Sequence, residues 1–99
     1  MIRHIVAFRL TSTDPAQRTL DARGIHDDLT ALVGVVPTVL SIEVGQDLGF
    51  VHDHWDVVLV SVHDSNADLE AYQVHPEHVK AAAWVATVVN DRATVDYEF

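Results

Sequence analysis

Hydrophobic and polar residues alternate with a period of two over the first ten positions of the chain. One side of this pattern consists of Ile2, His4, Val6, Phe8 and Leu10. The other side consists of Arg3, Ile5, Ala7 and Arg9. Successive side chains of a strand point to opposite faces, so the segment is predicted to be a β-strand. Its more apolar face carries a single polar residue, His4.

A long amphipathic helix is predicted next, over about residues 15–34. Asp14 is expected to cap its N-terminus, with Pro15 in the first turn. Apolar residues then recur at three- and four-residue steps, at Ala22, Ile25, Leu29, Leu32, Val33 and Val36. Gly24 lies inside this pattern, where glycine costs about 1 kcal/mol relative to alanine, so it is either tolerated or marks a kink. Pro37 ends the helical region.

Two strands joined by a hairpin loop are predicted in the middle of the chain. The first covers Leu40, Ile42 and Val44 and ends at Gly45, because these apolar residues alternate with polar ones. Residues 46–54 form the loop, and residues 55–63 form the second strand. This strand contains an apolar run, Val57–Val60, which is hydrophobic on both faces and must therefore be covered on both faces.

The C-terminal third predicts two helices and a last strand. Ser65 followed by Asp68 is typical of a capping box, and the helix it begins is expected to stop at His75, which precedes Pro76. The third helix begins at Pro76, and apolar residues nearly encircle it, which predicts deep packing. These residues are Val79, Ala82, Ala83, Val85, Ala86, Val88 and Val89. Residues 93–99 alternate again and predict a strand.

This order predicts one α+β domain over residues 1–99, with a ferredoxin-like βαββαβ fold. Such a fold has a four-stranded antiparallel sheet with its helices on one face. Val58, Val60 and Val62 would then contribute to an apolar patch on the opposite face. Packing two sheets face to face would cover that patch, so we expect a homodimer built as a dimeric α/β barrel.

The composition narrows the set of partners. Six Lys and Arg residues against fifteen Asp and Glu residues give a formal net charge of −9, which disfavours nucleic acid and membrane surfaces as partners. The absence of cysteine excludes a disulfide framework and a thiolate nucleophile. No apolar run approaches the roughly 20 residues of a membrane span, and the first residues lack the order of a signal peptide. We therefore expect a cytoplasmic protein.

Four segments of the chain are similar to a known family. They are Ile2–Val6, the turn Val35–Pro37, the segment Tyr72–Val79 with its His-Pro-Glu-His sequence, and Asp96–Tyr97. With them, the chain resembles the stress-responsive dimeric α/β-barrel (Dabb) family throughout its length. The resemblance implies a ferredoxin-like protomer and a barrel dimer, in agreement with the periodicity.

A plant branch of that family resembles cofactor-free polyketide cyclases, which perform an intramolecular aldol condensation with a histidine and a tyrosine. The matching positions here are His78 and Tyr72, and a histidine of the opening strand that lines the same cavity matches His4. The third helix departs from that branch with its Ala-Ala-Ala-Trp-Val sequence. The resemblance therefore does not carry over an acyl-chain substrate.

The residues themselves favour acid/base chemistry at a carbonyl group. His78 falls near the third residue of the third helix, where unpaired N–H groups disfavour an imidazolium ion. A neutral histidine can accept a proton from a carbon next to a carbonyl, and the Tyr72 hydroxyl can bond to the enolate oxygen. The alternative is structural: His78 packs or lies at the surface, His75 belongs to the helix cap, and Tyr72 fills core space.

The remaining polar candidates are weaker. His4 either has a hydrogen-bond partner in the core or lines a cavity. His52 and His54 would share one side of an extended segment, but a solvated loop is the better interpretation, and we predict no metal site. His63 and His26 are interpreted as a strand-end and a helix-surface residue, and Trp55 and Trp84 as packing residues.

Three functions remain open on this evidence. The first is a cofactor-independent cyclase or lyase that acts on a polyketide-like or other carbonyl substrate, with His78 as base, Tyr72 as donor and His4 orienting. The ligand expected with it is a small hydrophobic or aromatic carbonyl compound. The second is a non-enzymatic stress or binding protein. The third, by analogy of fold alone, is a cofactor-free monooxygenase. No cofactor is predicted, because phosphate-binding and dinucleotide-binding motifs are missing.

Overall fold

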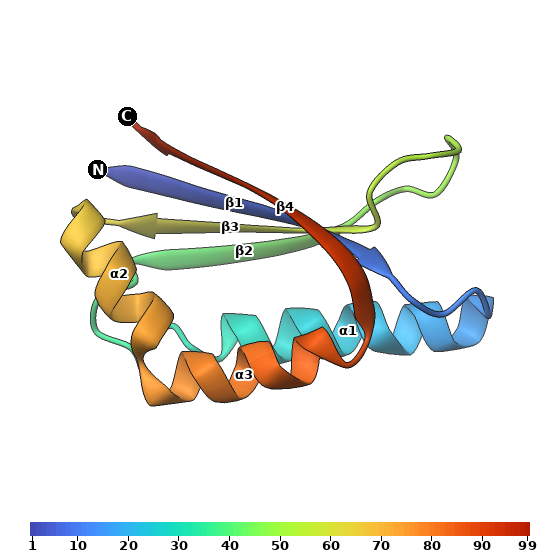
Figure 1. Cartoon of the computed structure of the whole chain (residues 1–99), viewed down its shortest axis with the longest axis horizontal. Helices are drawn as coiled ribbons and strands as arrows, with labels where there is room; N and C mark the ends of the chain where they lie inside the picture. The colour runs from blue at the N-terminus through green and yellow to red at the C-terminus, as the bar shows by residue number, and fades with distance from the viewer.

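The computed structural model describes residues 1–99 as four strands and three helices. In chain order they are β1 (Ile2–Leu10), α1 (Pro15–Thr30), β2 (Ser41–Gln46), β3 (Val57–His63), α2 (Asn66–Val74), α3 (Pro76–Ala86) and β4 (Val89–Glu98). The sheet has the order β2-β3-β1-β4, and every neighbouring pair is antiparallel. All three helices lie on one side of the sheet (Figure 1). The predicted ferredoxin-like βαββαβ fold is therefore confirmed.

The core lies between the sheet and the helices. Strand β1 contributes every second residue, so that His4, Val6, Phe8 and Leu10 are buried while their neighbours are only half-buried. Strand β3 does the same with Val57, Leu59, Ser61 and His63. Opposite these strands, the helices bury Ala22, Ile25, Leu29, Leu69, Tyr72, Ala81 and Val85. Three of these core positions, His4, Ser61 and His63, are polar.

Side-chain caps set the helix starts as predicted. Asp14 accepts a hydrogen bond from the Gln17 backbone N–H (2.9 Å), and Ser65 accepts one from the Asp68 N–H (3.1 Å). His75 has an extended backbone (φ −62°, ψ 135°) and both ends α2 and caps α3. Extended backbone is what a residue before proline prefers. This break turns the chain so that the first turn of α3 comes back against the end of α2.

Two predicted helix ends are wrong. Helix α1 ends at Thr30 rather than near residue 34, because residues 31–34 form a turn that contains Gly34 in the left-handed region (φ 85°). Helix α3 ends at Ala86, and Val89 begins β4, four residues before the expected strand. Val88 and Val89 continue the apolar pattern of the helix, but valine is β-branched and favours strands. An apolar pattern made of valine is therefore weak evidence for a helix, and here the chain has already left it.

The expected deep packing of α3 is also wrong. Only Ala81 and Val85 of this helix are buried, and Val79 is 53% exposed. Part of the apolar surface lines a cleft instead, through Ala82, Val85 and Ala86. The alanine and valine residues around this helix thus face the core on one side and the cleft on another. The periodicity of apolar residues does not distinguish these two environments.

Gly24 is explained by the contact between α1 and α3. A Cβ atom at this position would lie 2.3 Å from Cη2 of Trp84. Heavy atoms in contact are normally separated by about 3.5–4.0 Å, so the indole ring requires a residue without a side chain. The glycine is neither merely tolerated nor a kink, since α1 continues through it.

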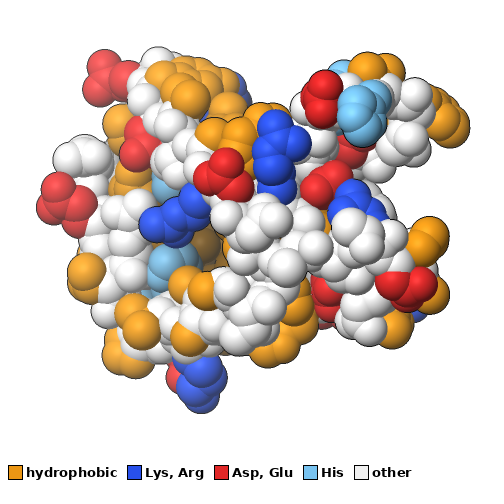
Figure 2. Space-filling model, turned by 45° about the vertical axis from the view of Figure 1, so that its right-hand side comes forward, with side chains coloured by type: hydrophobic (Ala, Val, Ile, Leu, Met, Phe, Trp, Pro, Cys, Tyr) orange, Lys and Arg blue, Asp and Glu red, His pale blue; other side chains and the backbone are white.

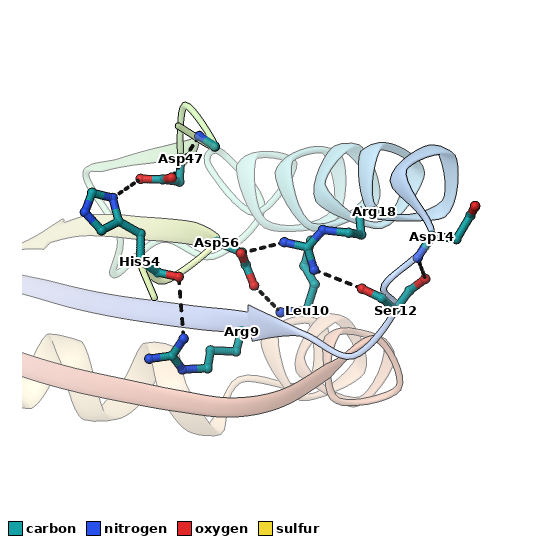
Figure 3. A network of polar contacts seen from close by, with 9 residues as sticks. Arg9, Leu10, Ser12, Asp14, Arg18, Asp47, His54 and Asp56 are labelled. Carbon is teal, nitrogen blue, oxygen red and sulfur yellow. Dashed lines mark hydrogen bonds and ion pairs between the residues drawn. The ribbon is translucent and has the colours of Figure 1, made fainter. Parts of the chain in front are cut away.

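A polar network holds the loop between β2 and β3 against the body of the protein (Figure 3). The Asp56 carboxylate accepts hydrogen bonds from the Arg18 guanidinium (2.6 Å) and from the Leu10 backbone N–H (2.8 Å). Arg18 also donates to the Ser12 carbonyl (2.9 Å). The base of the loop is therefore fixed to β1 and α1, and β3 begins at Val57 rather than at Trp55.

The face of the sheet opposite the helices is uncovered in the single chain (Figure 1). The strand register places Ile5 next to Val60 and Val95, and Ala7 next to Val58. Further apolar residues of this face are Val62, Tyr97 and Phe99. The predicted apolar patch is present, and we call it the open face. No helix of the chain is long and apolar enough to cross a membrane.

Candidate active site

A cleft of about 560 Å³ lies on the helix side of the sheet. Its apolar walls include Val6, Phe8, Leu59, Ala82, Val85 and Ala86. All three residues predicted from the sequence, His4, Tyr72 and His78, line it. Figure 2 shows a hollow that exposes hydrophobic and histidine atoms, with a basic side chain at its rim. The structure thus brings the three candidates together, as the acid/base interpretation requires.

Tyr72 is the central buried residue of this cluster. It lies near the end of α2, its side chain is fully buried, and its hydroxyl has no hydrogen-bond partner. A buried hydroxyl without a partner is uncommon, because leaving it unpaired costs about 1–3 kcal/mol. Burial raises the pKa of Tyr72 to about 12. The group is therefore a neutral O–H donor with nothing in the protein to receive its hydrogen bond.

His78 lies in the first turn of α3, beside Tyr72. The centres of the two rings are 4.4 Å apart. Nδ1 of His78 lies 3.0 Å from the Gln73 carbonyl oxygen. A carbonyl only accepts, so Nδ1 carries the hydrogen and Nε2 of the neutral ring keeps a free lone pair.

The surroundings keep His78 in this neutral form. Burial lowers the pKa of the imidazole. The hydrogen bond to the Gln73 carbonyl opposes that change, whereas positive charge at His4, Arg92 and His63 adds to it. The helix start at Pro76 acts in the same direction, because unpaired backbone N–H groups repel an imidazolium ion.

His4 is held by the carboxylate of Asp96, a residue for which no role in the site was predicted. Its Nδ1 pairs with Oδ1 of Asp96, which lies directly across from it in the register of β1 and β4. The His4 side chain is buried, and its other nitrogen, Nε2, has no hydrogen-bond partner in the chain. Both interpretations offered for His4 are thus present, since it has a polar partner and also lines the cleft.

His63 is a further histidine of the cluster and was not assigned to the site. It is the last residue of β3, as expected, but it is fully buried. Nδ1 donates to the Thr38 carbonyl (2.7 Å), and Nε2 accepts from the Ser61 hydroxyl (2.9 Å). Burial lowers the pKa of His63. Its ring centre is 4.9 Å from that of Tyr72, so the two rings pack against each other.

The histidines of the loop between β2 and β3 are far from forming a metal site. The side chain of His52 is 98% exposed, and Nδ1 of His54 is bonded to the Asp47 carboxylate at 3.1 Å. No three His, Asp or Glu side chains lie close enough together to hold a metal ion. His26 is exposed on α1 and pairs with Asp27, in agreement with its prediction as a surface residue.

The family model of the stress responsive A/B barrel domain, Dabb, matches residues 2–99. The chain belongs to the Dabb family. Among curated proteins, none matches the sequence significantly.

Solved structures share the whole fold of this Dabb chain. A dimeric protein of unknown function from Bacteroides fragilis is 32% identical, with a TM-score of 0.88 over 99% of this chain and 95% of its own. A dimeric ferredoxin-like protein of unknown function from Thermobifida fusca is 30% identical, with a TM-score of 0.81 over 99% and 90%. The hydroxynitrile lyase of Passiflora edulis is 22% identical, with a TM-score of 0.79 over 97% and 90%.

The cleft of the Dabb chain brings together side chains that can accept or donate a hydrogen bond. His78 offers a free Nε2 lone pair, and Tyr72 offers an unpaired O–H. His4, paired with Asp96, adds a second nitrogen at the same surface. A base and a hydrogen-bond donor within one apolar cleft are what enolate formation requires.

Proposed function

We propose that this Dabb chain is a cofactor-independent enzyme that transfers protons next to a carbonyl group, in a cyclase or lyase reaction. The observation that carries the proposal is the Tyr72 hydroxyl, buried and without a partner, beside the neutral ring of His78. A carbonyl oxygen of a substrate would be the missing acceptor. The ligand expected in an apolar cleft of this size is a small hydrophobic or aromatic carbonyl compound.

In the proposed step, Nε2 of His78 takes a proton from the carbon next to the substrate carbonyl. The electron pair of the broken C–H bond moves to the carbonyl oxygen, which becomes an enolate. The Tyr72 hydroxyl donates a hydrogen bond to that oxygen as its negative charge develops. In a cyclase reaction, the enolate carbon then adds to a second carbonyl carbon of the substrate, the π electrons of that carbonyl move to its oxygen, and the imidazolium of His78 gives its proton to the resulting alkoxide. In a lyase reaction, the enolate instead forms a C=C bond as the bond from the next carbon to a leaving group breaks, and the leaving group departs with the electron pair and accepts the proton from His78. His4, fixed by Asp96, orients the substrate.

The proposed assembly is a homodimer through the open face. The relatives from Bacteroides fragilis and Thermobifida fusca are described as dimeric. In this chain the open face is apolar and uncovered, whereas the cleft lies on the helix side. Two sheets packed face to face would therefore form one barrel and leave both clefts accessible.

Deuterium exchange tests the chemistry without a known substrate. The protein is mixed in D₂O with acetophenone and 4-phenyl-2-butanone, and loss of the protons next to the carbonyl is followed by proton NMR. We expect the protein to accelerate exchange, and His78→Ala to lower the rate by roughly 10²–10⁴-fold, the usual contribution of a general base. The control is His26→Ala, which removes an exposed histidine of α1 and should leave the rate unchanged.

Tyr72→Phe separates catalysis from folding. Removal of a hydroxyl that has no partner should not lower the melting temperature, whereas exchange should slow by roughly 10²–10³-fold, as for loss of one oxyanion donor. Ketones that shift the NMR signals of His78 but exchange at the buffer rate would contradict the proposal and favour a binding protein. A large drop in the melting temperature of His78→Ala, with ketone binding and the exchange rate unchanged while the variant is folded, would favour a structural role.

A further inference from the structure

Arg92 is the one Lys or Arg side chain that lines the cleft. It lies on β4 directly across from Phe8, on the helix-facing side of the sheet. Thr94 and Asp96 follow on the same side, beside Val6 and His4. The cleft therefore has the acid/base groups in its wall and a guanidinium on the strand that borders it.

The guanidinium of Arg92 has no ion-pair partner, although the chain has fifteen Asp and Glu residues. Most other cations are engaged: Arg3 over Phe99, Arg9 over Trp55, Arg18 with Asp56, and Lys80 with Glu77. Asp91 also lines the cleft, but its carboxylate accepts a hydrogen bond from the backbone N–H of Arg92 (2.9 Å). The Asp96 carboxylate pairs with His4 instead.

We propose that the cleft selects carbonyl compounds that carry a carboxylate, with the carboxylate on Arg92 and the carbonyl at Tyr72 and His78. This proposal rests on the proposed function and names its substrate class, an oxo acid with an apolar body. The planar guanidinium fork matches a carboxylate with two parallel hydrogen bonds. A chain with a net charge of −9 repels small anions, so a local cation is needed to hold one.

Binding of such an anion would also raise the pKa of the proposed base, His78. The charge of Arg92 is one of the influences that lower the pKa of His78. A carboxylate seated on Arg92 would offset that charge, so the pKa of His78 would rise toward its ordinary value and Nε2 would become a stronger base. By reciprocity, protonation of His78 would tighten binding of the anion.

The test uses benzoylformate and its neutral analogue benzoylformamide. Neither has a hydrogen on the carbon next to the ketone, so both can bind but neither can be deprotonated there. Dissociation constants are measured by calorimetry at low salt for the wild type, Arg92→Gln and Arg23→Gln. Arg23 is the matched control, an exposed arginine of α1 that lies outside the cleft.

We expect the wild type and Arg23→Gln to bind benzoylformate at least about tenfold more tightly than the amide, the range of a charge-assisted hydrogen bond. Arg92→Gln should lose this preference and keep its affinity for the amide, which also shows that it is folded. Benzoylformate should raise the pKa of His78 in the wild type but not in Arg92→Gln, as followed by NMR.

Equal affinity for the two probes in the wild type, an anion preference that survives in Arg92→Gln, or binding of neither probe would overturn the inference. The two proposals fail separately. An anion preference that depends on Arg92, without catalysed exchange of ketones, would refute only the proposed reaction. Catalysed exchange without an anion preference would refute only the substrate class.

Discussion

At the scale of single residues, burial sets the protonation states that the proposed chemistry uses. Tyr72 and His78 titrate in opposite directions from their ordinary values for the same reason, since the apolar surroundings penalise the charged form of each. The tyrosine stays a donor and the histidine stays an acceptor over a wide pH range. Their ring centres lie 4.4 Å apart, so in the proposed reaction one substrate would meet both the proton of the tyrosine and the lone pair of the histidine.

This arrangement predicts the pH dependence of the exchange reaction. The pKa of His78 is lowered from 6.5, and protonation of Nε2 abolishes the base, so the rate should fall on acidification only below about pH 6.5. Tyr72, with a pKa of about 12, should introduce no loss of rate on the alkaline side below about pH 11. The measurement is the exchange rate from pH 4.5 to 10.5, together with an NMR titration of the His78 ring.

The control for that profile is His26, an exposed histidine outside the cleft. A midpoint of the acid limb above pH 6.5, or one that follows His26 rather than His78, would contradict the assignment of the base. In Tyr72→Phe the acid limb should keep its position, because the hydroxyl is not the group that titrates there.

The sequence was enough to find some cleft residues but not others. His4 was noticed because it interrupts an apolar face, and Tyr72 and His78 because they flank the His75–Pro76 break and match the family's motif. His63 shares its face with Val57 and Leu59, so its period-two position could have indicated burial. Arg92 lines the cleft, and Asp96 lies across from His4, only because β4 pairs with β1 in one register, and no local sequence pattern specifies that register.

At the scale of elements, the contact between α1 and α3 depends on a close approach of Trp84 to the α1 backbone at Gly24. Gly24→Ala would gain up to about 1 kcal/mol of helix propensity but would place a methyl group 2.3 Å from the indole. Overpacking of this kind costs about 1–3 kcal/mol, so the variant should be less stable than the wild type in urea unfolding.

Two variants check this prediction. Gly45→Ala is the matched control, because its Cβ would meet only Cγ1 of Val58, at an ordinary 3.8 Å, and stability should not fall. In a Trp84→Leu background the clash is removed, so Gly24→Ala should there be neutral or stabilising. A Gly24→Ala protein that is more stable than the wild type would show that the indole moves aside without cost.

At the scale of the whole molecule, the order and type of the elements were predictable because proline breaks, caps and period-two alternation all occur at their boundaries. The ends of the elements were less predictable where valine and alanine residues are compatible with a helix, with a strand and with the wall of a cleft, as at Val88–Val89. The cleft itself could not be predicted, since the residues that line it come from strands and helices that are far apart in the sequence. Periodicity identifies which face of an element is apolar, but not whether that face meets a core or a void.

The open face leads to the last prediction, a dimer that one charge at its centre should disrupt. Val60 lies on β3 across from Ile5 and Glu43, so Val60→Lys places a cation beside a carboxylate of its own sheet and is tolerated by the single chain. In the dimer the same lysine would be buried with its copy, at a cost of several kcal/mol.

Sedimentation should show a dimer for the wild type and for Val74→Lys, a substitution at an exposed site on α2, but a folded monomer for Val60→Lys. Since the cleft lies on the other side of the sheet, that monomer should still bind benzoylformate. A monomeric wild type at micromolar concentration would refute the dimer, and loss of binding in the Val60→Lys monomer would show that the partner chain completes the cleft.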